Sequence, residues 1–296
     1  MPSSRLRLRG LVLISLAAVS WGTTGSVTTV LVSGAAAGPL VIGAARTVIA
    51  AALLLVAARW AAGPLRIDAA DRWRCLALGA CMAAFQVTYF SAVTLAGIAV
   101  AALVAICSAP LLIAGLAAAR LGERLTVRVG LALALGVAGT ALLIVGPRTL
   151  ADVSPRFLAG VLLALGASVS YALYVVLAKA ALARTAPMPL AAATFAVAAL
   201  LLAPLLTGPE AGRQIALGWP WLLYLGAVTT AGAYAIYTLG LRDVPASVAG
   251  IASLMEPLTA TLLGVGLFGE RLGAAGAAGA LLLLAAMGLL VTRDAA

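Results

Sequence analysis

The residue types best placed to do chemistry begin with Glu256, a single carboxylate inside a long apolar stretch. It lies 14 residues from both Arg242 and Glu270. At a helical rise of about 1.5 Å per residue, this places it near the middle of any membrane helix that the stretch forms. A charge there costs about 2.5–3.5 kcal/mol, so a functional role is the first interpretation. We expect Glu256 to bind a substrate or a proton; the alternative is a structural glutamate that bonds a free carbonyl.

Arginine and aromatic residues inside other apolar stretches could supply the rest of a binding site. Arg46 could hold a substrate carboxylate through two hydrogen bonds, or it could extend towards water or pair with another helix. Aromatic residues come in pairs three or four positions apart, which share one helix face. They predict a tyrosine-lined cavity for an apolar or aromatic solute, with interhelical packing as the alternative for each ring. The candidate cavity residues besides Arg46 and Glu256 are Trp21, Phe85, Gln86, Tyr89, Ser108, Tyr171, Tyr174, Tyr234 and Tyr237.

Two prolines and two Gly-Glu-Arg sequences occupy matching places in the chain. Pro110 and Pro257 each remove a backbone hydrogen bond from an apolar helix, so both are candidate hinges. A glutamate follows 13 residues after each proline. The Glu-Arg pairs could form exchangeable salt bridges that gate a path, and simple capping of helix ends explains them equally well. These candidate gate residues are Glu123, Arg124, Glu270 and Arg271.

The elements that must position these residues are membrane helices. Of the 296 residues, 64% are apolar and 9% are charged, whereas soluble domains carry about 25% charged residues. The sequence has no histidine and three cysteines, all in apolar stretches. We therefore expect an integral membrane protein with no metal site, cofactor or disulfide framework.

Apolar runs of about 20 residues, the length that spans a bilayer, divide the chain into ten predicted helices with short connections. Lysine and arginine predict their orientation, because cytoplasmic connections carry the excess of positive charge. With the N-terminus inside, 14 basic residues lie inside, four lie outside, and Arg46 is within a helix. Both termini are therefore expected in the cytoplasm. The predicted spans are 10–31, 39–58, 74–95, 97–118, 125–146, 157–178, 188–206, 218–240, 244–267 and 273–292.

The chain also repeats itself. The segment that begins at Gly10 matches the one that begins at Gly160, and the segment from Ala109 matches the one from Glu256, which aligns Pro110 with Pro257. Each half then holds five spans, and an odd number inserts the second half with opposite polarity. Inverted halves can exchange conformations and open a central site to either side in turn, which is typical of transporters.

Ten spans, two halves and the repeated Pro-x12-Glu-Arg block resemble the drug/metabolite transporter superfamily, in particular its EamA-repeat exporters. The resemblance covers residues from about 10 to 291. It implies an all-α membrane fold of two repeats, 1–147 and 156–292, in which spans one to four and six to nine surround a central cavity. It also implies export of small metabolites, and the similarity to aromatic amino-acid exporters favours amino acids as substrates.

Other classes fit the sequence less well. An intramembrane enzyme needs a nucleophile–base pair, paired carboxylates or metal ligands, and none is present. A nucleotide-driven pump lacks its phosphate-binding loop, and the dispersed arginines give no basic face for nucleic acid. Multidrug or nucleoside export and a non-transporting assembly subunit remain the alternatives. We expect a bacterial inner-membrane protein whose partners are a small solute and the lipid bilayer, with Gly273, Gly276 and Gly279 as a possible homodimer contact.

Overall fold

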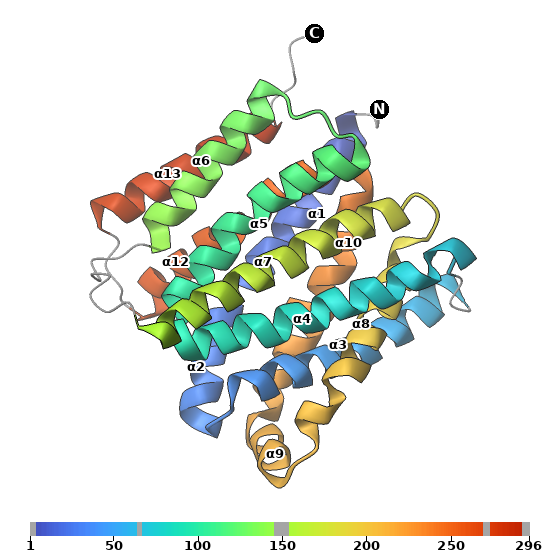
Figure 1. The fold of residues 1–296 in the computed structure, drawn as a ribbon, viewed down its shortest axis with the longest axis vertical. Coiled ribbons are helices and arrows are strands. Elements are labelled where there is room, and N and C mark those ends of the chain that lie inside the picture. The colour runs from blue at the N-terminus through green and yellow to red at the C-terminus, as the bar shows by residue number, and fades with distance from the viewer. Residues whose placement is uncertain (1–3, 64–66, 145–153, 269–272, 292–296) are drawn as a thin grey trace.

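The computed structural model describes residues 4–63, 67–144, 154–268 and 273–291. Over these ranges every regular element is a helix, and together they form one bundle (Figure 1). Nine of the described helical segments are long and apolar enough to cross a membrane, and Val127–Leu142 is a shorter apolar helix. Each of the ten predicted spans therefore coincides with one apolar helix or with two or three consecutive helical segments.

The bounds of the elements show which spans are continuous and which are interrupted. In chain order they are α1 (Ser4–Gly22), α2 (Thr24–Ala35), α3 (Pro39–Ala62), η1 (Ala69–Asp71), α4 (Arg72–Ala96), α5 (Ile98–Leu121), α6 (Val127–Ile144), α7 (Pro155–Ala181), α8 (Pro187–Leu202), η2 (Ala203–Leu206), α9 (Pro209–Tyr224), η3 (Leu225–Gly232), α10 (Ala233–Asp243), α11 (Ala246–Ala252), α12 (Met255–Phe268) and α13 (Ala274–Val291). The first span thus consists of α1 and α2, the eighth of α9, η3 and α10, and the ninth of α11 and α12.

The helix ends follow from local sequence. Pro39, Pro155 and Pro187 stand at the start of α3, α7 and α8, where the missing proline N–H would have no helical partner. Gly97 and Gly122 lie at the two ends of α5 with φ angles of 85° and 66°, which glycine adopts without steric cost. Short turns at these glycines return the chain directly into the bundle.

Packing pairs relate the two halves of the chain. α4 and α5 pack on α7, and in the same way α10 and α12 pack on α1, while α3 packs on α8. α6 and α13 pack on each other at one edge of the bundle (Figure 1). A Cβ on Gly139 would lie 2.7 Å from the Gly279 carbonyl oxygen, so Gly279 allows close packing of α13 on α6.

Three membrane-level interruptions are present within the described residues, and one of them, in the ninth span, adjoins the predicted hinge at Pro257. The first span breaks at Thr23, the ninth breaks at Ser253 and Leu254, and the eighth contains the π-helical segment η3. Such interruptions inside a membrane are found where they line a site or a cavity. α5, by contrast, is helical without interruption through Pro110, so the matched pair of breaks expected at the two prolines is found at one of them.

Candidate functional site

The three interruptions meet at one level of the bundle. A Cβ on Gly22, beside the break in the first span, would lie 2.7 Å from the Glu256 carbonyl oxygen. The Thr23 and Tyr224 hydroxyls lie 3.0 Å apart, and the Ser20 hydroxyl donates to the carbonyl of Val228 in η3 at 3.3 Å. The first, eighth and ninth spans therefore surround a common centre with irregular backbone.

Glu256 stands at the second position of α12, directly after the break. Its backbone N–H donates to the carbonyl of Ser253, three residues earlier, at 3.1 Å. A regular α-helix would bond the residue four positions earlier. The side chain is half-buried and makes no hydrogen bond or ion pair with the described residues. The helix start stabilises its negative charge, and the carboxylate remains available to a ligand.

Arg46 lies on α3 and is 9% exposed. It donates to Gln86 Oε1 at 3.0 Å, and the Gln86 amide donates in turn to the Thr47 hydroxyl at 3.3 Å. Its guanidinium carbon lies 5.5 Å from the centroid of the Phe90 ring. Gln86 thus orients the guanidinium, and the Nε atom of Arg46 has no partner within the described residues.

Arg46 and Glu256 interact electrostatically without forming an ion pair in the described structure. Arg46 lies within electrostatic range of Glu256, Tyr89 and Tyr234. The described residues nevertheless contain no ion pair between Arg46 and Glu256, although each side chain is long enough to approach a partner. A cation and an anion held apart in this way can bind the two ends of a zwitterion.

Aromatic rings form a continuous cluster beside these charges, with Trp21 at its centre. The Trp21 ring lies 5.0 Å from Tyr234 and 5.3 Å from Tyr237, measured between centroids. Phe85 lies 5.9 Å from Tyr171, which extends the cluster to α4. The remaining predicted rings also belong to it, since Tyr174 contacts Tyr171 and Tyr234, and Tyr89 stacks on Phe85.

Several polar atoms in this cluster are buried and unpaired. The Tyr171 and Tyr237 hydroxyls and the indole nitrogen of Trp21 have no hydrogen-bond partner within the described residues. The two tyrosine hydroxyls approach each other and the Ser253 hydroxyl at the break of the ninth span. Buried polar groups are normally paired, so a set of unpaired ones indicates a place for a ligand.

Ser108 and the two threonines of η3 are further hydroxyl groups in the membrane spans. Ser108 is half-buried on α5 and makes no side-chain hydrogen bond within the described part of the chain. Thr229 and Thr230 both donate to the Leu225 carbonyl, at 2.9 and 2.8 Å, and so stabilise the π-helical turn of η3. The donor of each threonine hydroxyl is therefore already used within the helix.

The structure gives Glu123 a capping role. Its carboxylate accepts from the N–H groups of Ala246 and Ser247 at 2.6 and 3.1 Å, and from the Ser247 hydroxyl at 2.7 Å. It therefore fastens the end of the fourth span to the start of α11. Arg124 is exposed and takes no part in this contact. Glu270 and Arg271 lie outside the described residues.

Lys179 caps the other side of the same turn. Its ammonium donates to the carbonyls of Leu241, Arg242 and Val244 at 2.8, 3.1 and 2.7 Å, which satisfies the end of α10. We call Glu123 and Lys179 together the turn clamp. Lys179 is the single lysine of the chain and sits in an apolar run, and this was the signal that could have identified it from sequence.

Further residues that the sequence did not single out support the site or the bundle. Phe195 on α8 lies 4.7 Å from Tyr234 between ring centroids, and Thr47 completes the Arg46–Gln86 chain. Away from the site, buried Asp71 binds Arg74, and Arg184 donates to it at 2.9 Å. The Asp71 carboxylate raises the pKa of Arg184 through this hydrogen bond.

The sequence profile of the EamA-like transporter family matches residues 8–145 and 158–292. The chain belongs to this family. It is therefore a membrane transporter of the drug/metabolite type, as the sequence analysis inferred from the repeat and the Glu-Arg block. The two matched ranges cover most of the chain and leave a short connection between them.

Individual relatives agree with this assignment. A Bacillus subtilis (strain 168) protein, described as the uncharacterized transporter YwfM, is 37% identical over 286 residues, which cover 94% of this chain and 91% of the relative. An uncharacterized transporter of Archaeoglobus fulgidus is 30% identical over 153 residues, about half of each chain. A solved crystal structure superposes with a TM-score of 0.78 at 24% identity and covers 95% of both chains, which supports the fold.

Proposed function

We propose that this transporter carries small zwitterionic metabolites, amino acids with apolar or aromatic side chains first among them. The observation behind the proposal is that Arg46 and Glu256 are close enough to interact electrostatically, and that the described residues contain no ion pair between them. The aromatic cluster around Trp21 lies beside them. A solute with a carboxylate, an ammonium and an apolar side chain complements all three features.

The binding chemistry follows from each group. Arg46, oriented by Gln86, offers donors to a carboxylate, and such charge-assisted bonds are stronger than neutral ones. Glu256 accepts from an ammonium at the start of α12. The aromatic rings accommodate an apolar side chain, and the unpaired Tyr171 and Tyr237 hydroxyls offer further hydrogen bonds.

Alternating access is the mechanism that we infer for this site. The matched packing of α4 and α5 on α7, and of α10 and α12 on α1, supports two inverted repeats, 1–147 and 156–292, that exchange roles. The turn clamp fastens α10 and α11 at one end of the bundle. Its release would let the ninth span separate from the fourth, and the eighth from the sixth, at that end. We further propose that both termini lie in the cytoplasm of a bacterial cell, and that transport is export across the inner membrane, as the resemblance to EamA-repeat exporters implies.

Flux into proteoliposomes tests the proposal. Labelled phenylalanine, threonine and a nucleoside are compared, with and without a pH gradient, for the unchanged protein and for Glu256→Gln. We expect saturable uptake of phenylalanine, with kcat/KM lowered by about 10- to 100-fold in Glu256→Gln. Dependence on the pH gradient that disappears in the variant would make Glu256 the coupling residue. Saturable flux of the nucleoside alone would overturn the amino-acid assignment.

A further inference from the structure

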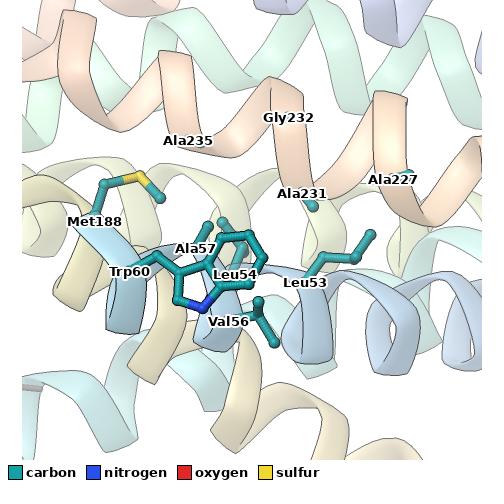
Figure 2. Close-up of a pocket in the computed structure, with 10 residues that line it drawn as sticks. All are labelled: Leu53, Leu54, Val56, Ala57, Trp60, Met188, Ala227, Ala231, Gly232 and Ala235. Carbon is teal, nitrogen blue, oxygen red and sulfur yellow. The ribbon is translucent and has the colours of Figure 1, made fainter. Parts of the chain in front are cut away.

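An apolar slot opens on the side of the bundle, away from the charged site. It has a volume of about 340 Å³, within the lower part of the range for ligand pockets, roughly 300–1,000 Å³. One wall is α3 and the other is the η3–α10 segment, with Met188 of α8 at one end (Figure 2). The lining residues are Leu53, Leu54, Val56, Ala57, Trp60, Met188, Ala227, Ala231, Gly232 and Ala235.

The slot faces the surface that contacts the bilayer. Leu53 and Val56 are 39% and 48% exposed, and Trp60 is 86% exposed. The opposite wall consists of alanines and a glycine, which leave room for a guest between the helices. Exposed tryptophan near a helix end is typical of the headgroup level of a membrane, so the slot extends from that level towards the bilayer centre.

Positive charge flanks the end of the slot at Trp60. Arg59 precedes Trp60 on α3 and is exposed, and Arg242 is exposed seven residues after Ala235, on the same face of α10. The two walls run in the same direction, because Gly226 packs on Ile49 at the other end. From this contact, Arg242 lies about six residues, or roughly 9 Å, further along its helix than Arg59. The two arginines therefore flank the same end of the slot one after the other, and neither forms an ion pair with a described residue.

We propose that this slot is a binding site for an anionic phospholipid. One acyl chain lies between α3 and α10, and the phosphate lies between Arg59 and Arg242. The apolar lining excludes a polar guest. The two cations select against zwitterionic lipids, since a basic residue near the surface contributes about 1 kcal/mol of attraction to anionic lipid, or about fivefold in affinity.

The bound lipid would act on transport through η3. This segment forms one wall of the slot, and its other side contacts the site: a Cβ on Gly226 would lie 3.2 Å from the Arg46 carbonyl oxygen, and Val228 accepts from Ser20. A chain held in the slot therefore fixes the distance between the helix of Arg46 and the helix of Tyr234 and Tyr237. This role is additional to the proposed function and does not require a particular substrate.

Quenching of Trp60 fluorescence by brominated lipids tests the site directly. Purified protein is reconstituted in phosphatidylcholine with increasing brominated phosphatidylglycerol, or with brominated phosphatidylcholine, and the signal of Trp60→Phe is subtracted. We expect quenching by phosphatidylglycerol at a mole fraction at least about fivefold lower. Arg59→Gln with Arg242→Gln should abolish this preference, whereas Arg120→Gln, an exposed arginine on α5, should leave it unchanged.

A variant that fills the slot with a larger side chain is a second, independent test. Ala235→Phe should remove the preferential quenching, while Ala278→Phe, on the exposed face of α13, should not. Equal quenching by the two lipids, or a preference that survives both the double arginine variant and Ala235→Phe, would overturn the proposal. Because the readout is fluorescence and not flux, it remains informative even if the substrate assignment fails.

Discussion

The fourth and ninth spans occupy equivalent places in the two halves, and they differ in one respect. Both contain a proline at the matching position, yet α5 is continuous through Pro110 whereas the ninth span breaks before Pro257. At the repeat offset of 147, Glu256 and Ser253 correspond to Ala109 and Ile106. Both spans thus contain the proline, but at these two positions only the ninth span has polar residues, Glu256 and Ser253.

The difference teaches what opens a membrane helix. A proline removes one backbone hydrogen bond, and a neighbouring helix can satisfy the carbonyl that is left without a donor. In the ninth span, Ser253 donates to the Ala249 carbonyl at 3.0 Å, and Glu256 bonds back to Ser253 through its N–H. Side-chain bonds of this kind compete with the regular helix. The broken span is therefore the one that holds the carboxylate of the site.

The largest effect is expected for the charges of the site. Glu256→Gln and Arg46→Gln should each lower transport kcat/KM by about 10- to 100-fold, because a hydrogen bond to a charged group contributes about 1.5–3 kcal/mol. Initial rates in proteoliposomes measure this. Glu210→Gln, at an exposed Glu210–Arg213 pair on α9, should transport normally, and a comparable loss there would mean that the assay responds to charge in general.

The turn clamp connects the two compared spans, and its removal should shift the conformational equilibrium. Glu123→Gln should increase opening at that end by about 2- to 30-fold, since loss of a helix cap costs about 0.5–2 kcal/mol. The measurement is labelling of a cysteine at buried position Ala249, in a variant without Cys75, Cys81 and Cys107, by an impermeant thiol reagent. Unchanged labelling in both Glu123→Gln and Lys179→Met would remove the clamp from the mechanism.

Replacing each proline by alanine tests the comparison itself. Pro257→Ala restores an N–H that can bond Ser253 and close the break, so transport should fall by about 2- to 10-fold, the value of a net hydrogen bond. Pro110→Ala should change transport less than twofold, about the error of such assays. Equal losses in the two variants would show that both prolines act as hinges, contrary to the continuous helix of α5.

The smallest effect is expected for the unpaired hydroxyls near the break. Tyr237→Phe and Tyr171→Phe remove groups that have no partner in the described structure. Thermal stability should stay the same or rise, while KM for the transported amino acid should increase by about two- to fivefold, equivalent to about 1 kcal/mol or less. Thermal unfolding together with KM separates these outcomes, and loss of stability without a change in KM would assign the hydroxyls to packing.

Local sequence predicted most of the architecture. Hydropathy located all ten apolar segments, and the spacing of the aromatic pairs identified rings that the fold does bring together around Trp21. The edge position of α6 and α13 followed from the family resemblance. Arg46 and Gln86 were both named as candidates, but their hydrogen bond, which joins residues 40 positions apart, could not be read from either helix alone.

Contacts across the bundle account for what the sequence did not predict. For Glu123 the sequence left a salt bridge with Arg124 and helix capping open, and the helix that it caps begins more than 120 residues away. The π-helical turn of η3 depends on Thr229 and Thr230 bonding one carbonyl, and hydropathy carries no signal for it. The close approach of Gly22 to the Glu256 carbonyl, just after the break, likewise joins residues far apart in the sequence.

The most direct test of the account is competition by analogues that lack one charge. Uptake of labelled phenylalanine is measured in proteoliposomes against unlabelled phenylalanine, 2-phenylethylamine and 3-phenylpropionate. Because Arg46 and Glu256 each bind one end of the zwitterion, phenylalanine should compete at least about tenfold better than either analogue. Equal competition by all three compounds would contradict the central claim that Arg46 and Glu256 bind the two charged groups of the substrate at the same time.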